Sequence, residues 1–187
     1  MKTHIFPAIK LTLLLLVLLC GVYTLVVLGI AKAVPGSGKG EVIEQNGKKY
    51  YANIGQQFTE DRYFYSRPSA VDYNAAGSGA SNKGPSNEEY LATVSTRIDT
   101  FLLHNLGIKK SEIPVDLVTA SGSGLDPDIS VAAAKVQVKR IATLRQLSPE
   151  VVLKVIDQQT EKPFLGVFGP EKINVLKLNI ALNGLKK

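Results

Sequence analysis

Residues 11–31 read LTLLLLVLLCGVYTLVVLGIA and contain no charged side chain, while Lys10 and Lys32 stand at the two ends. A helix rises about 1.5 Å per residue, so this stretch measures roughly 30 Å, which matches the hydrocarbon core of a bilayer. The hydroxyls of Thr12 and Thr24 can bond to carbonyls about one turn back and need not oppose burial in lipid. The pattern predicts one transmembrane helix, followed by a single soluble domain held at a membrane.

Two other interpretations of this stretch are weaker. Ala31-Lys32-Ala33 has the A-x-A form of a signal-peptide cleavage site, but the apolar run is longer than the roughly 7–15 residues of a signal peptide's apolar region. A lipoprotein anchor on Cys20 would need a small residue before the cysteine, and Leu19 stands there. Cys20 is therefore interpreted as a small apolar residue within the helix.

Composition limits the function of the soluble part. The 187 residues include 22 Lys and Arg against 16 Asp and Glu, which gives a net charge of +6. No basic run is longer than two lysines and no aromatic platform accompanies the basic residues, so nucleic-acid binding is not predicted. The single cysteine leaves no disulfide framework. Because lysines flank both ends of the apolar stretch, charge gives only a slight preference for a domain outside the cytoplasm.

A β-hairpin is predicted at the start of the soluble domain. Asn46-Gly47 lies between residues 41–45 and 48–54, and Asn-Gly is favoured in two-residue hairpin turns because both turn positions need a positive φ. Gly and Ser mark the connection that precedes it as a flexible linker. The chain is thus divided into four parts: a short tail (1–10), the transmembrane helix (11–31), a linker (32–40) and a soluble domain (41–187).

About three helices are predicted to follow the hairpin. Ser86 with Glu89 has the form of a capping box, and Gly107 ends the helix that they begin. Ser130 begins a second helix that runs to about Gln146, and Ser148 begins a third with proline at its first position. Residues 173–185 are predicted to be a strand that runs into a helix capped by Asn174. The fold class is therefore α+β.

The most unusual stretch of the domain is VTASGSGLDPDIS, residues 118–130. Its glycines and the helix after it are compatible with a phosphate cradle, but no lysine is near and Asp126 and Asp128 would repel a phosphate. Neither Ser121 nor Ser123 lies in a G-x-S-x-G motif, so no catalytic residue is predicted. Asp116 with the other two acids lacks calcium-site spacing, so no metal site is predicted. An ordered turn at a helix N-terminus is favoured.

Three other features are interpreted as structural. Arg67 stands beside Pro68 among aromatic residues, where a buried ion pair is more common than a catalytic role. His104 falls near a helix end, where a cation is favoured by the helix dipole. Residues 77–87 are interpreted as an ordered surface loop rather than a ligand site.

Four blocks of sequence resemble the C subunit of the Kdp potassium-transporting ATPase. They are residues 63–70 (YFYSRPSA), 81–87 (SNKGPSN), 114–127 (PVDLVTASGSGLDP) and 174–182 (NVLKLNIAL). The short pairs Thr160-Glu161 and Leu165-Gly166 resemble the family as well. The blocks are long, specific and in the order of the family. The chain departs from the family pattern at five positions: Lys32, Ala80, Lys83, Asp128 and Val131. Lys32 replaces a glutamine, which puts any polar role of that glutamine in doubt.

The resemblance implies a non-catalytic accessory subunit of a high-affinity, ATP-driven potassium importer in the bacterial inner membrane. Its partners would be a channel-like A subunit, a P-type ATPase B subunit, a small F peptide and the lipid bilayer, with a single-pass helix and an extracytoplasmic domain. No cofactor is implied for the chain itself, and ATP would enter through the complex. The resemblance points to one candidate nucleotide- or partner-contact loop and to three further motif positions: Ser121, Gly122, Ser123, Gly124 and Asp126 in the loop, with Arg67, Asn82 and Asn174 outside it.

Two hypotheses of different classes follow from the resemblance. In the first, the chain docks on the channel-like and ATP-hydrolysing subunits and stabilises them. In the second, it is a catalytic chaperone that raises the ATP affinity of the B subunit by binding nucleotide through residues 121–124. The two conflict for an extracytoplasmic domain, because ATP is cytoplasmic, and coupling would then have to pass through the membrane.

Overall fold

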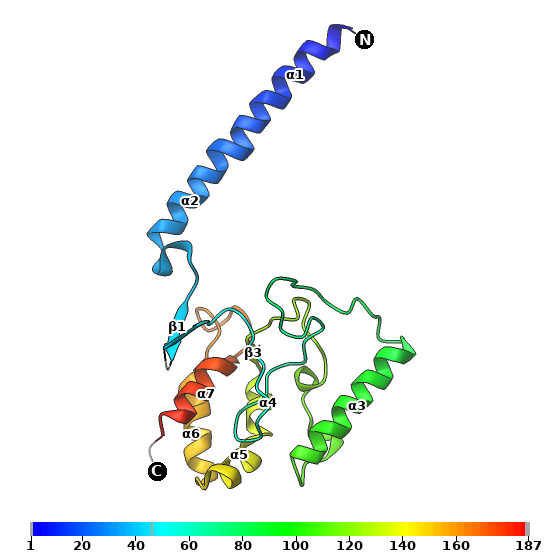
Figure 1. The fold of residues 1–187 in the computed structure, drawn as a ribbon, viewed down its shortest axis with the longest axis vertical. Coiled ribbons are helices and arrows are strands. Elements are labelled where there is room, and N and C mark those ends of the chain that lie inside the picture. The colour runs from blue at the N-terminus through cyan, green and yellow to red at the C-terminus, as the bar shows by residue number, and fades with distance from the viewer. Residues whose placement is uncertain (1, 46, 186–187) are drawn as a thin grey trace. The chain divides into compact units, whose positions relative to one another are not determined.

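The computed structural model describes residues 2–45 and 47–185. The chain divides into two compact units, Met1–Tyr51 and Ala52–Lys187, which we call the N-terminal and C-terminal units. Figure 1 shows the long helix of the first unit and the helical packing of the second.

The N-terminal unit consists of one long helix and a hairpin. The helix comprises α1 (Lys2–Leu16), a π-helical turn η1 (Val17–Tyr23) and α2 (Thr24–Ala33). Within it, Thr3–Ala33 is long and apolar enough to cross a membrane. The Thr24 hydroxyl donates to the Leu19 carbonyl (3.3 Å), so this polar group is satisfied inside the helix.

The hairpin that follows confirms the prediction from Asn-Gly. After a short 3₁₀ turn η2 (Pro35–Gly38), β1 (Val42–Gln45) pairs antiparallel with β2 (Lys48–Tyr51). Gln45 lies opposite Lys48, and Gly47 has a φ of 73°, as a two-residue turn requires. Asn46, the other turn residue, lies outside the described residues.

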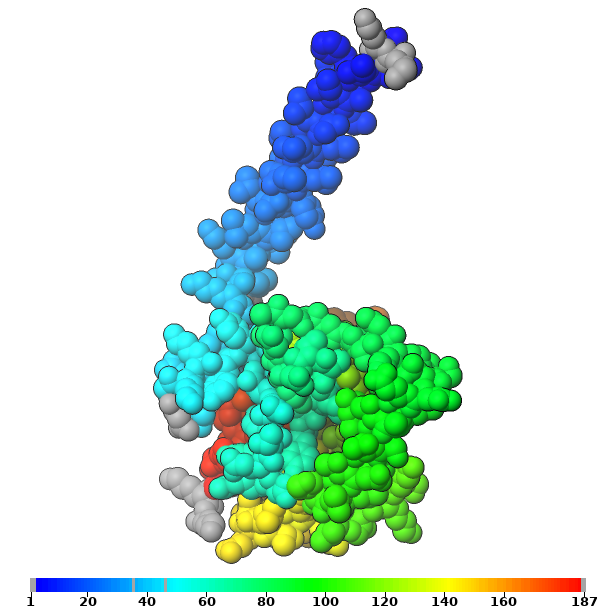
Figure 2. Space-filling model, turned by 45° about the vertical axis from the view of Figure 1, so that its right-hand side comes forward, coloured from blue at the N-terminus to red at the C-terminus, as the bar shows by residue number. Residues whose placement is uncertain are grey.

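The C-terminal unit begins with a long segment without helix or strand, residues 52–87, which we call the irregular segment. The elements after it are α3 (Glu88–His104), η3 (Lys110–Glu112), η4 (Val115–Leu117), β3 (Asp128–Ile129), α4 (Val131–Lys135), α5 (Val138–Arg145), α6 (Pro149–Gln159), β4 (Thr160–Glu161), β5 (Lys172–Asn174) and α7 (Val175–Asn183). The last three strands form an antiparallel sheet in the order β3-β5-β4. In Figure 2 the irregular segment and α3, teal to green, cover one face of this unit.

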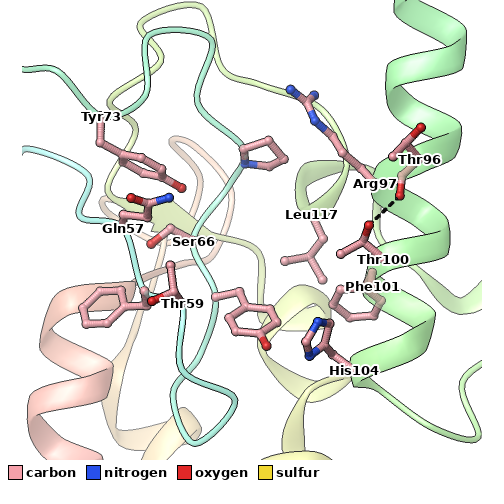
Figure 3. Close-up of a pocket in the computed structure, with 13 residues that line it drawn as sticks. Gln57, Thr59, Ser66, Tyr73, Thr96, Arg97, Thr100, Phe101, His104 and Leu117 are labelled. Atoms are coloured by element: carbon pink, nitrogen blue, oxygen red, sulfur yellow. Dashed lines mark hydrogen bonds between the residues drawn. The ribbon is translucent and has the colours of Figure 1, made fainter.

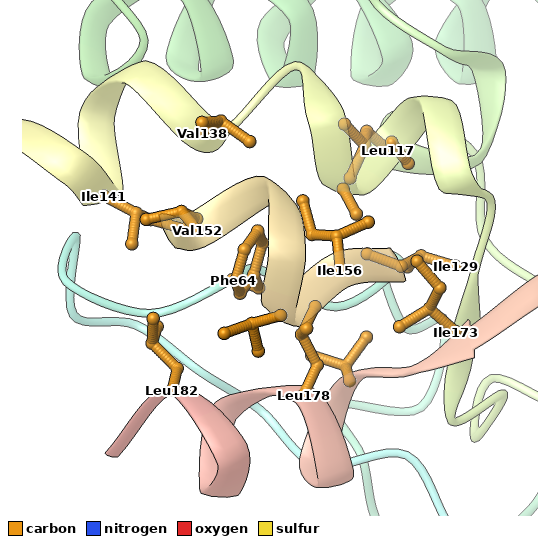
Figure 4. Close-up of a cluster of buried hydrophobic side chains, with 14 of the residues drawn as sticks. Phe64, Leu117, Ile129, Val138, Ile141, Val152, Ile156, Ile173, Leu178 and Leu182 are labelled. Atoms are coloured by element: carbon orange, nitrogen blue, oxygen red, sulfur yellow. The ribbon is translucent and has the colours of Figure 1, made fainter. Parts of the chain in front are cut away.

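The core of this unit lies between α4, α5, α6 and α7. Phe64 of the irregular segment is fully buried there, and Figure 4 shows it among Val152 and Ile156 of α6 and Leu178 of α7. Apolar residues recur on one face of each of these helices, as amphipathic helices packed on a common core require.

Helix boundaries differ from the prediction at two places. The N-cap of the first helix is Asn87, not Ser86, because the Asn87 side chain accepts the Tyr90 amide (2.9 Å), and Glu89 pairs with Lys83 instead of completing a capping box. The predicted helix 130–146 is broken into α4 and α5 at Gln137, whose side chain donates to the Ala133 carbonyl one turn back. The caps at Ser130, Ser148 and Asn174 are confirmed.

Candidate functional site

The Ser-Gly-Ser-Gly loop is closed by its own hydrogen bonds. The amide of Gly124 donates to the Ser121 hydroxyl (3.0 Å), and the amide of Leu125 donates to the Ser123 hydroxyl (3.1 Å). The two hydroxyls lie 3.3 Å apart, and Ser121 is buried. The serines therefore stabilise the turn, as short polar side chains do in Ser/Thr turns.

Hydrogen-bond donors of the irregular segment bind the carbonyl groups of this loop. The Ser69 hydroxyl donates to the Gly124 carbonyl (2.6 Å), while the Gly79 amide and the Ser78 hydroxyl both donate to the Ser123 carbonyl (2.9 and 3.1 Å). A further amide, that of Gly55, donates to the Leu125 carbonyl (2.7 Å). The start of the predicted surface loop thus packs on the Ser-Gly-Ser-Gly turn through Ser78 and Gly79.

The two glycines of the turn have different surroundings. Gly124 has a φ of 66°, and a Cβ built on it would lie 2.8 Å from both the Gly79 carbonyl oxygen and the Val71 side chain. Gly122 has no heavy atom within 4 Å of such a Cβ. Glycine is therefore needed at 124 for both conformation and space, while position 122 faces open space.

The acidic residues near the loop bind groups of the protein. Asp126 pairs with Arg67 (2.7 Å) and also accepts the Asp128 amide, while Asp128 pairs with Lys172 (2.6 Å). Asp116 accepts the amide of Ser130 at the start of α4. The predicted ion pair of Arg67 is confirmed, although it is half-buried. Within residues 2–45 and 47–185, no three acidic, His or Cys side chains gather as a metal site would require.

A shallow hollow lies beside the loop. It is lined by the loop itself, Asn53, Ile54, Ser78 and Arg67. The Nε atom of Arg67 is buried and has no hydrogen-bond partner among the described residues. The hollow is thus lined by the Arg67 cation, by the Asp126 carboxylate and by Gly122, which faces open space.

A second groove lies between α3 and the irregular segment, and Figure 3 shows side chains from both walls facing one another. Its volume is about 350 Å³, and its lining includes Arg97, Phe101, Tyr65 and Tyr73. Burial raises the pKa of Tyr73 to about 12, and burial with a hydrogen bond to Asp61 raises the pKa of Tyr65 to about 12. No sequence motif indicated this groove, because its walls come from distant segments.

Asp61 links the irregular segment to α3 beside this groove. Its carboxylate pairs with the ring of His104 in the last turn of α3 (2.9 Å) and accepts the Tyr65 hydroxyl. These two hydrogen bonds, that of His104 above all, lower the pKa of Asp61. His104 therefore lies at the helix end, as predicted, and ties α3 to the irregular segment.

Buried polar side chains hold the irregular segment in place. The Arg140 guanidinium donates to Asn105 Oδ1 (2.9 Å), to Gln137 Oε1 (2.7 Å) and to backbone carbonyls of the irregular segment, and it stacks on the Tyr65 ring at 4.0 Å. Asn179 of α7 accepts the Phe64 amide (2.9 Å) and donates to the Phe64 carbonyl (3.0 Å). No motif in the sequence indicated these residues; their only signal is a polar residue on an otherwise apolar helix face.

Comparison with known proteins now identifies the family. A family model described as "KdpC: K+-transporting ATPase, c chain" matches residues 5–184. The chain belongs to the KdpC family. Proteins named "Potassium-transporting ATPase KdpC subunit" are 54% identical in Flavobacterium johnsoniae (98% of this chain, 99% of the relative), 51% in Bacteroides fragilis (100% and 99%) and 45% in Bacillus mycoides (97% and 95%). The resemblance seen in the sequence is confirmed over the full length of these relatives.

The candidate residues named from the resemblance are only partly brought together. Arg67 and Asp126 form the ion pair beside the turn, and the Pro127 carbonyl accepts the Val175 amide (2.9 Å), so Asn174 lies next to the end of the loop. Asn174 itself is buried, caps α7, and donates to the Ala52 carbonyl (2.7 Å). Asn82 is exposed with a φ of 53°, and none of the described contacts joins it to the loop.

Proposed function

We propose that this chain is a non-catalytic subunit that assembles with the channel-like A subunit and the ATP-hydrolysing B subunit of a potassium-importing ATPase and stabilises them. One observation carries the proposal: the amides of Gly124 and Leu125 and the hydroxyls of Ser121 and Ser123 are engaged by the protein's own groups. Groups satisfied in this way gain little from a phosphate, because they would exchange one hydrogen bond for another. The loop is then a rigid surface for a partner.

The relatives' names support potassium transport as the context. In this proposal the long apolar helix anchors the chain once in the bacterial inner membrane, the C-terminal unit is extracytoplasmic, and a small F peptide joins the complex. Four parts serve this role: a tail (1–10), a membrane helix (11–31), a linker (32–40) and the soluble domain (41–187).

A second candidate function is nucleotide-dependent regulation of the B subunit. It is favoured by the hollow beside residues 120–123, where Gly122 is open. Its difficulty is the Asp126 carboxylate in the same hollow, which repels a phosphate.

Removal of residues 52–187 separates the two functions. The variant keeps the membrane helix and is co-expressed with the other subunits, which are then purified in mild detergent. The assembly proposal expects the A and B subunits to separate or to be lost. An intact complex that hydrolyses ATP with a raised KM would contradict it and favour the regulator.

Sidedness provides the second test. Lys109 is exposed, so Lys109→Cys in a Cys20→Ser background is labelled in intact cells with a membrane-impermeant thiol reagent. Labelling of intact cells is the expected result. Labelling only after lysis would contradict the extracytoplasmic location and bring residues 121–124 within reach of cytoplasmic ATP.

A further inference from the structure

The connection between β4 and β5 exposes an unusual number of large apolar side chains. Phe164, Leu165, Val167 and Phe168 are 72%, 76%, 74% and 64% exposed, and we call these four residues the apolar tip. Single exposed apolar residues are ordinary, but a contiguous group indicates a surface that is covered in the working molecule.

The backbone of the apolar tip is satisfied internally. Phe164 and Phe168 exchange two backbone hydrogen bonds of 3.0 Å, and the amides of Gly166 and Val167 donate to the carbonyls of Pro163 (2.9 Å) and Phe164 (3.2 Å). Leu165 and Gly166 have φ values of 54° and 75°. A turn that pairs its own amides can leave water at a lower cost than an open loop, because few donors lose a partner.

Charged residues are confined to the base of this connection. Glu161 and Lys162 precede the tip, and Glu171 and Lys172 follow it. Lys172 pairs with Asp128 (2.6 Å) and Glu161 (3.6 Å), which fixes part of this charged base against the sheet. The connection is thus an uncharged apolar end on a charged base with no net charge, which is the distribution of a segment that lies partly in lipid and partly in water.

The chain enters the C-terminal unit beside this base. Ala52 is the first residue of the unit, and its carbonyl accepts the Asn174 side-chain amide (2.7 Å), while Asn174 ends β5. Only residues 34–51 separate Ala52 from the end of the apolar helix. The base of the tip thus lies close, within the C-terminal unit, to the point where the chain continues toward the apolar helix, and tethering raises the effective concentration of a weak ligand.

We propose that the apolar tip inserts into the interfacial region of the lipid bilayer and forms a second membrane contact of this chain. The four side chains stand on one tight turn, with the ring centroids of Phe164 and Phe168 6.5 Å apart, and fluid lipid accepts such a group without a preformed pocket. Because the segment carries no net charge, its insertion depends neither on anionic lipid nor on ionic strength. The proposal rests on membrane anchoring by the long helix and not on which subunits bind.

Fluorescence quenching in lipid nanodiscs tests the proposal with the full chain and no other subunit. Val167→Cys in a Cys20→Ser background carries a small fluorophore, and the nanodiscs contain phosphatidylcholine with a spin label near the headgroup. The matched control is Leu103→Cys, which is 76% exposed in the last turn of α3. Quenching at 167 should exceed quenching at 103 at least about twofold, equally at low and high salt.

A double variant provides the second measurement. Phe164→Ser with Phe168→Ser removes two exposed rings that lie outside the core, so the melting temperature should stay the same while quenching at 167 falls to the level at 103. Equal quenching at the two positions would overturn the proposal. Quenching that arises only with anionic lipid, or protection of position 167 only when the A subunit is added, would also overturn it and assign the tip to a charge effect or to a protein pocket.

Discussion

Gly124 is the residue of the turn at which an added methyl group meets the most resistance. Its φ of 66° and the Gly79 carbonyl 2.8 Å from a built Cβ both oppose alanine. We expect Gly124→Ala to lower the free energy of unfolding of the C-terminal unit by roughly 2 kcal/mol, because it combines left-handed strain with a backbone clash.

Urea unfolding of the full chain in detergent measures this change. Gly122→Ala is the matched control in the same turn, and it should stay within about 0.5 kcal/mol of the wild type, since its Cβ meets open space. Equal losses for the two variants would contradict the contacts described for Gly124.

Arg140 is a second residue whose replacement should lower the stability of the C-terminal unit. Replacement by methionine keeps much of the side-chain volume but leaves Asn105 Oδ1 and carbonyls of the irregular segment without their donor. We expect a loss of roughly 3 kcal/mol in urea unfolding, because buried acceptors then lack a partner. Lys139→Met on the same helix is the control: Lys139 is exposed, and a comparable loss there would show that the effect is not specific to this network.

Asn174 connects two parts of the C-terminal unit. The side chain caps α7 and also donates to the Ala52 carbonyl. Asn174→Ala should therefore cost roughly 2–3 kcal/mol, more than the roughly 1 kcal/mol expected for Asn87→Ala, which removes only the exposed cap of α3. Thermal melting of both variants in parallel checks this order, and the reverse order would refute the role of the Ala52 contact.

Local sequence patterns predict some elements of the fold and not others. Caps such as Ser148 and Asn174 and the hairpin at Gly47 rest on local rules, so their positions were predicted. The two-residue strands β3 and β4 are too short to show alternation. The closure of the turn by Ser69 depends on a partner 55 residues away, and no local pattern contains such a contact.

Alkaline pH should destabilise the C-terminal unit as a whole. The pKa values of Tyr65 and Tyr73 are raised from 10.0 to about 12, so between pH 10 and about 12 the unfolded chain loses protons that the folded chain retains. Stability is then fully present below pH 10 and is lost as pH rises through this window.

Melting temperature against pH measures this loss. The double variant Tyr65→Phe with Tyr73→Phe should show a shallower decline above pH 10 than the wild type. Tyr51→Phe, in the hairpin of the N-terminal unit, controls for the loss of a tyrosine and should decline as the wild type does. Parallel curves for all three proteins would show that the hydroxyls of Tyr65 and Tyr73 do not cause the loss.

The two hydrogen bonds between the Asn179 side chain and the Phe64 backbone bear on when the C-terminal unit can fold during synthesis. The two residues are 115 positions apart, and Phe64 is the fully buried side chain around which α6 and α7 pack. The ribosome exposes the irregular segment long before it releases α7, so early folding intermediates cannot contain this contact. The apolar helix is meanwhile already available to the insertion machinery. In the proposed membrane-anchored protein, insertion of the apolar helix therefore precedes folding of residues 52–187.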